Sequence, residues 1–156
     1  MLVAGIDPGT NRIGYALVKS GPPADFISAE VISIPSHLEA PDRLSLLHHE
    51  LARRLTRDNP EAVAVEKLFF AKNTKTALAV AEARGIILLT VQNLVRNIWE
   101  YTPLEIKMAL TGYGRADKDQ MRRMVRMTFP KRVLPKSDDA VDALAIALAA
   151  MYLRRN

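Results

Sequence analysis

Two short apolar segments of this chain run without interruption and then stop at an acidic residue. Residues 2–6 end at Asp7, and residues 62–65 end at Glu66. A continuous apolar run of about four to eight residues is typical of a strand that is buried on both faces. Strands of this kind need helices on both sides of their sheet. The pattern therefore favours an α/β protein in which acidic residues stand at the ends of central strands.

The rest of the chain predicts further strands and the helices that cover them. Turn-forming residues at 7–11 predict a hairpin between the strand at 2–6 and a strand at 13–18. Three meandering strands followed by alternating helices and strands predict a mixed sheet with helices on both faces. The remaining elements are a strand at 26–34, a helix at 42–57, a helix at 74–93, a strand at 97–101, and helices beginning at 102, 116 and, with Ser137 as its N-cap, 138.

Length and composition limit the class of protein. A chain of 156 residues is long enough for one domain with a substantial core, so we expect a single domain over residues 1–156. The sequence has no cysteine, which excludes disulfides, zinc fingers, thiol catalysis and iron–sulfur ligation. Any metal ion must be held by oxygen atoms or by one of only three histidines.

Neither the N-terminus nor the longest apolar run indicates a membrane protein. Residues 1–7 lack the basic region of a signal peptide. The longest apolar run, 143–153, is shorter than the roughly 20 residues that a membrane-spanning helix needs. We therefore expect a cytoplasmic protein that does not cross a membrane.

Positive charge is concentrated in the second part of the chain. Residues 1–65 contain six basic and eight acidic residues, whereas residues 66–156 contain sixteen basic and nine acidic ones. This asymmetry indicates a polyanionic partner, either a nucleic acid or an anionic membrane. The alternative is a solvated basic surface without a partner.

Four acidic residues are candidates for chemistry: Asp7, Glu66, Asp139 and Asp142. The last two are three positions apart, so they share a face of the C-terminal helix. Buried carboxylates are costly unless they are paired or bind a cation, and two divalent ions in such a site can activate water against a phosphodiester. Carboxylates beside basic residues therefore favour a nuclease. Each acid also has a simpler interpretation, as a turn residue, a helix-start acid or an exposed strand end.

Three segments, 5–10, 64–73 and 139–147, closely resemble the three acidic motifs of the bacterial RuvC family of Holliday-junction resolvases. The resemblance also covers 82–85, Lys107 and 112–118, and so nearly the whole chain. It implies an RNase H-like fold with a five-stranded mixed sheet flanked by helices. It further implies a homodimer that binds four-way DNA junctions in recombination and repair, nicks two strands symmetrically with Mg²⁺ or Mn²⁺, and works with the RuvA–RuvB branch-migration complex.

The resemblance also implies roles for individual residues. Asp7, Glu66, Asp139 and Asp142 would be the catalytic, metal-binding acids, with Asp7 bridging two ions. The family usually has one acid where this chain has Asp138 and Asp139, and helical spacing favours Asp139 as the ligand. The implied DNA contacts are stacking by Phe69 on an unpaired base, backbone contacts by Lys107 and Lys118, and weaker contacts by Lys72, Asn73 and Arg115.

Two other functions fit part of the sequence. Residues 7–10 resemble the phosphate loop of actin-like and sugar-kinase-like nucleotide binders, but a second such loop is missing from these 156 residues. A non-catalytic, junction-binding module would explain the basic residues but not the four acids. The apolar stretch at 77–89 is either a core helix or a dimer face, and the resemblance favours the dimer.

Overall fold

A five-stranded mixed sheet forms the centre of the molecule. The computed structural model describes residues 1–67 and 74–154. The sheet order is β3-β2-β1-β4-β5. Strand β1 pairs antiparallel with β2 and parallel with β4, which confirms the predicted hairpin and the predicted mixed sheet. The strands are β1 (Leu2–Asp7), β2 (Arg12–Lys19), β3 (Asp25–Ser33), β4 (Ala62–Glu66) and β5 (Asn97–Tyr101).

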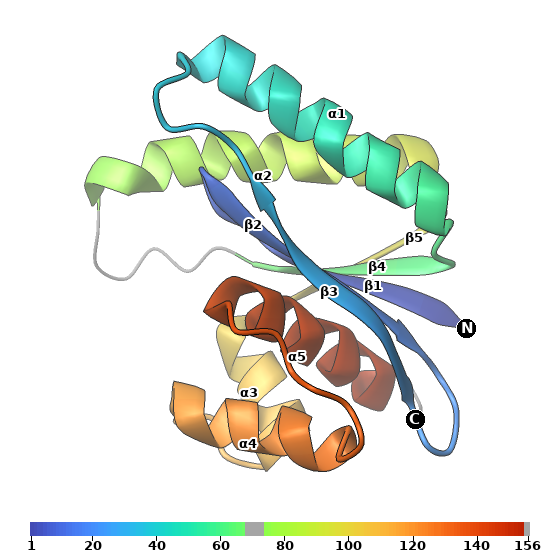
Figure 1. Ribbon diagram of the computed structural model, residues 1–156. Coiled ribbons are helices and arrows are strands. Elements are labelled where there is room, and N and C mark those ends of the chain that lie inside the picture. Colours follow the sequence, from blue (N-terminus) through green and yellow to red (C-terminus); the bar gives the residue numbers. More distant parts are fainter. Residues whose placement is uncertain (68–73, 155–156) are drawn as a thin grey trace.

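Helices cover both faces of this sheet, as the sequence predicted (Figure 1). Helices α1 (Ala40–Asp58) and α2 (Thr74–Leu94) lie on one face and pack against each other. Helices α3 (Pro103–Thr111), α4 (Lys118–Thr128) and α5 (Asp138–Leu153) lie on the other face. Of these three, α5 makes the main contact with the central strands, and its residues from Ala140 to Met151 are almost all buried.

Alternation along β1 and β4 decides which side chains reach the α5 face. Successive residues of a strand point to opposite faces of the sheet. Ala4 and Ile6 belong to the core under α1 and α2, whereas Val3 belongs to the core under α5. The same alternation places Asp7 on the α5 face, and Glu66 follows Ala64 there from β4. Both acids therefore leave the sheet on the side of the C-terminal helix.

Two glycines let α5 lie directly on the strands. A Cβ at Gly5 would collide with the Ala143 carbonyl oxygen, and a Cβ at Gly14 would collide with the Asp139 carbonyl oxygen. Gly14 is also the cross-strand partner of Asp7 in the hairpin. The close approach at Gly14 thus brings the first turn of α5 next to the end of β1.

Side-chain caps fix the starts of the two short helices beside α5. Thr102 accepts a hydrogen bond from the Glu105 backbone in a capping box at α3, and Asp117 does the same with Gln120 at α4. Ser137 occupies the N-cap position of α5, as predicted, but its side chain makes no capping hydrogen bond. The Ser137 hydroxyl is instead engaged by neighbouring side chains.

One helical segment of the described chain has the length and composition of a membrane span. It is Ala77–Leu94 in α2, and 22% of it is buried inside the molecule. Glu82 and Arg84 interrupt the apolar residues of this segment, so it does not stand out in the sequence as a long uninterrupted apolar run. The inner face of α2, with Ala83, Ile87 and Val91, packs onto the sheet as part of the core.

Candidate active site

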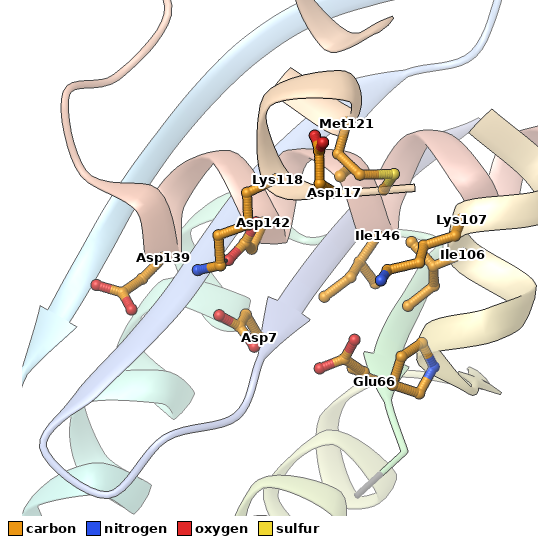
Figure 2. A pocket seen from close by; sticks show the side chains of 12 residues that line it. Asp7, Glu66, Ile106, Lys107, Asp117, Lys118, Met121, Asp139, Asp142 and Ile146 are labelled. Atoms are coloured by element: carbon orange, nitrogen blue, oxygen red, sulfur yellow. Dashed lines mark hydrogen bonds and ion pairs between the residues drawn. The ribbon is translucent and has the colours of Figure 1, made fainter. Parts of the chain in front are cut away.

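A pocket of about 390 Å³ opens where β1, β4 and the helices α3, α4 and α5 meet. Figure 2 shows its lining, with carboxylates from the strands facing residues of the three helices. All four acids that the sequence singled out line this pocket. They are Asp7 from β1, Glu66 from β4, and Asp139 and Asp142 from α5.

The two strand acids are held close together by the parallel pairing of β1 with β4. Ile6 is the cross-strand partner of Val65, so the residues that follow, Asp7 and Glu66, end neighbouring strands at the same edge. Burial raises the pKa of Asp7 to about 8, and the charges of Glu66, Asp142 and Asp139 add to this effect. Burial and the charge of Asp142 raise the pKa of Glu66 to about 7. Without a bound cation, this edge of the sheet thus disfavours the ionised form of both carboxyl groups.

Asp142 is the acid that a lysine partly neutralises. The Lys118 Nζ lies 3.4 Å from the Asp142 Oδ2, and Figure 2 shows the two side chains together. Burial nevertheless raises the pKa of Asp142, because desolvation outweighs the opposing effect of the lysine. The same ion pair raises the pKa of Lys118, which therefore stays charged.

Asp139 pairs with an arginine, not with Lys118. The Arg12 Nε donates a hydrogen bond to the Asp139 Oδ2 over 2.8 Å, and the Ser137 hydroxyl lies 3.2 Å from the same oxygen. In Figure 2 the Asp139 side chain points away from the centre of the pocket. Its neighbour Asp138 pairs with Arg122 at 3.0 Å and does not line the pocket. Of the two adjacent acids, Asp139 is therefore the one beside the candidate site.

The donor set fits a hard divalent cation, although its side chains do not form a closed coordination shell. Within residues 1–67 and 74–154, no three acidic or histidine side chains stand close enough to hold one ion. The reason is that Asp139 turns to Arg12 while Asp142 turns to Lys118. Carboxylate oxygens that are buried and repel one another are nevertheless the ligands that Mg²⁺ and Mn²⁺ prefer.

The predicted DNA-binding residues divide into three groups. Lys107 and Lys118 line the pocket opposite the acids. Arg115 is exposed and does not belong to the lining. Phe69, Lys72 and Asn73 lie outside the described residues.

Two polar residues beside the acids were missed by the sequence analysis. Arg12 was overlooked because a single arginine at the start of a strand carries no motif. Asp117 lines the pocket, but its carboxylate accepts the hydrogen bond of the α4 N-cap. The capping-box spacing between Asp117 and Gln120 can be read in the sequence, and it indicates that the Asp117 carboxylate caps α4.

Sheet order, strand-end carboxylates and facing lysines together define an RNase H-like nuclease. Residues 3–150 match the family model described as "Crossover junction endodeoxyribonuclease RuvC", and the chain belongs to this family. The predicted family, and with it the predicted endonuclease activity on DNA, is confirmed.

Individual relatives resemble the chain over nearly their full length. A crossover junction endodeoxyribonuclease RuvC of Thermomicrobium roseum is 49% identical over 155 residues, which cover 99% of this chain and 95% of the relative. The structure of Thermus thermophilus RuvC has a TM-score of 0.87 at 35% identity, covering 99% of this chain and 96% of that one. T. thermophilus RuvC in complex with its Holliday junction substrate has a TM-score of 0.86 at 32% identity, covering 100% and 97%. These likenesses confirm the predicted RNase H-like fold.

Proposed function

We propose that this chain resolves four-way DNA junctions in recombination and repair by hydrolysing phosphodiester bonds in the pocket between β1, β4 and α5. The observation that carries this proposal is the gathering of four carboxylates opposite Lys107 and Lys118 in one pocket. Membership of the crossover junction endodeoxyribonuclease family supports the reaction, and the junction complex of the Thermus thermophilus relative supports the substrate.

The acids have the role of holding the metal. Nucleases of this family are metal-dependent. Asp7, Glu66, Asp139 and Asp142 would hold Mg²⁺ or Mn²⁺, with up to two ions in the pocket. A divalent ion held by these acids would supply a water molecule of lowered pKa and stabilisation of the leaving oxygen of the phosphodiester. Burial of the acids at this edge strengthens their attraction for a cation, because the effective dielectric constant is lower there than in water.

The lysines have the role of positioning the DNA backbone. Lys107 on α3 and Lys118 on α4 flank the acids, so a phosphate placed between them lies opposite Asp7 and Glu66. Lys118 stays charged because Asp142 raises its pKa. For Phe69, Lys72 and Asn73, which follow β4 in the sequence, and for Arg115 we propose further DNA contacts.

Two copies of the chain would cut two strands of one junction. The outward stripe of α2 contains Leu78, Glu82, Gly85 and Leu89, and its leucines are 71% and 56% exposed. Space beside Gly85 is open, which lets another helix approach closely. We propose that α2 packs against the same helix of a second copy, since a two-fold dimer offers two active sites to a substrate with four arms. The expected setting is the cytoplasm, with the RuvA–RuvB branch-migration complex as partner.

Cleavage of synthetic DNA tests the proposed function. A four-way junction, a flap and a linear duplex are incubated with the chain and with Mg²⁺ or Mn²⁺. We expect paired nicks in the junction alone, and loss of nicking but not of junction binding in Asp7→Asn and Glu66→Gln. Binding without metal-stimulated nicking would indicate a non-catalytic junction-binding module. Equal cutting of linear duplex would contradict the junction specificity.

A further inference from the structure

Helix α4 carries an arginine surface outside the candidate active site. Arg122, Arg123 and Arg126 line a hollow of about 360 Å³ together with a single acid, Asp119. Arg123 and Arg126 are exposed, whereas Arg122 is partly covered. In Figure 1, α4 lies at the outer side of the helical layer that covers the α5 face of the sheet. We call these three residues the α4 arginine surface.

The α4 arginine surface continues directly from the pocket. Lys118, the first residue of α4, lines the pocket beside Asp142. Arg122 and Arg126 follow Lys118 at four-residue spacing, so these three side chains form one stripe along the helix. Arg123 lines the same hollow as Arg122 and Arg126. At a rise of about 1.5 Å per residue, the stripe runs about 12 Å along the axis. That length corresponds to roughly three to four nucleotides of a DNA strand, at about 3.4 Å each.

Folding does not explain two of the three arginines. Arg122 has structural partners, since it contacts Asp138 at 3.0 Å and donates to the Pro135 carbonyl at 2.9 Å. Arg123 and Arg126 have no carboxylate within ion-pair distance in the part of the chain that the structure describes. Like charges three or four positions apart destabilise a helix. Met121 and Val125, which are buried, already hold α4 against the core.

We propose that the α4 arginine surface binds the phosphate backbone of one duplex arm of the junction, three to four nucleotides from the phosphodiester that is cut. Arginine suits this ligand because its planar guanidinium binds two phosphate oxygens at once. The proposal rests on the proposed active site, because Lys118 sets the point from which the distance along the DNA is counted. The α4 arginine surface is thus a second contact region for DNA beside the pocket, and it fixes the angle at which the arm leaves the pocket.

Paired charge-removing variants test the α4 arginine surface. The double variant Arg123→Gln/Arg126→Gln is compared with Arg43→Gln/Arg53→Gln on α1, which covers the opposite face of the sheet. Both lose two positive charges, so the general attraction between protein and DNA falls equally. Affinity for a four-way junction is measured over a range of salt concentrations, together with nicking at saturating protein and a hydroxyl-radical footprint.

We expect the α4 double variant to lose affinity for the junction and the α1 double variant to keep it. The α4 variant binds about tenfold more weakly at physiological salt, and its salt dependence loses about two phosphate contacts. Its nicking rate at saturation is unchanged, and footprint protection is lost three to four nucleotides from the cut.

Equal affinity and equal footprints for the two double variants would overturn the proposal. Failure of the unmodified chain to nick junctions would overturn the proposed function instead. Arg123→Lys/Arg126→Lys keeps the charges and is expected to recover most of the affinity and the salt dependence.

Discussion

Arg12 and Asp139 are joined by a hydrogen bond of 2.8 Å although 127 positions separate them in the sequence. The arginine stands at the start of β2, and the acid stands in the first turn of α5. A second nitrogen of the same guanidinium donates to the Ser137 hydroxyl over 2.9 Å. Arg12 thus binds the carboxylate that we propose as a metal ligand, and a divalent cation competes with it for the same oxygens.

Removing this competitor is expected to strengthen metal binding. A partly exposed ion pair contributes little free energy, so Arg12→Gln should lower the dissociation constant for Mn²⁺ by about two- to fivefold. Calorimetric titration of Mn²⁺ into the protein measures this change. Arg132→Gln is the matched control, because it breaks an exposed pair with Asp25 and removes the same charge. Equal or weaker Mn²⁺ binding by the Arg12 variant than by this control would contradict the prediction.

Asp7→Asn is expected to raise the stability of the protein without metal while it abolishes nicking. The pKa of Asp7 in the folded chain, about 8, lies above its ordinary value of 3.8. The protonated form therefore favours folding at low pH, and this contribution is lost as the pH rises through about 8. Asparagine resembles the protonated acid and carries no charge at any pH.

The melting temperature, compared at two pH values, measures this effect. With a chelator present, the Tm of Asp7→Asn should exceed that of the unmodified chain by on the order of 5 °C near pH 8. Near pH 5, only about one unit above the ordinary pKa of 3.8, little of this stability has yet been lost, so the gain should be smaller. Arg132→Gln, far from the acids, should show no such pH-dependent gain. A Tm difference that is independent of pH would contradict the pKa assigned to Asp7.

Gly14 is expected to tolerate no side chain. A Cβ there collides with the Asp139 carbonyl oxygen, so Gly14→Ala must push the first turn of α5 away from the sheet. Overpacking of this kind costs about 1–3 kcal/mol, and the displaced Asp139 should lower the nicking rate as well. Denaturant unfolding and junction cleavage measure the two effects. Gly21→Ala, whose Cβ meets one carbonyl oxygen at 3.2 Å in a turn, should change both only slightly. Equal unfolding free energies for the two variants would contradict the argument.

The sequence predicted the strand-end acids because their positions follow from local patterns. An apolar run that ends in an acid predicts where Asp7 and Glu66 stand, and parallel pairing brings them to one edge. The turn of Asp139 towards Arg12 could not be predicted in this way, because it depends on α5 packing against the start of β2. The role of Gly14 was likewise invisible, since a glycine within a strand pattern does not reveal which backbone will lie over it.

The exposed face of helix α2 predicts how many copies of the chain form the active nuclease. We expect a two-fold dimer of twice 17.3 kDa in which Leu89, 56% exposed in the single chain, is buried against the partner. Leu89→Glu would place an unpaired charge in that apolar contact, so the variant should elute as a monomer in size-exclusion chromatography with light scattering. Val133→Glu, at a loop position that is 94% exposed, adds the same charge and should remain dimeric. The Leu89 variant should also release singly nicked junctions, because one active site cuts one strand at a time. A dimeric Leu89→Glu protein would exclude this face of α2 as the contact between copies.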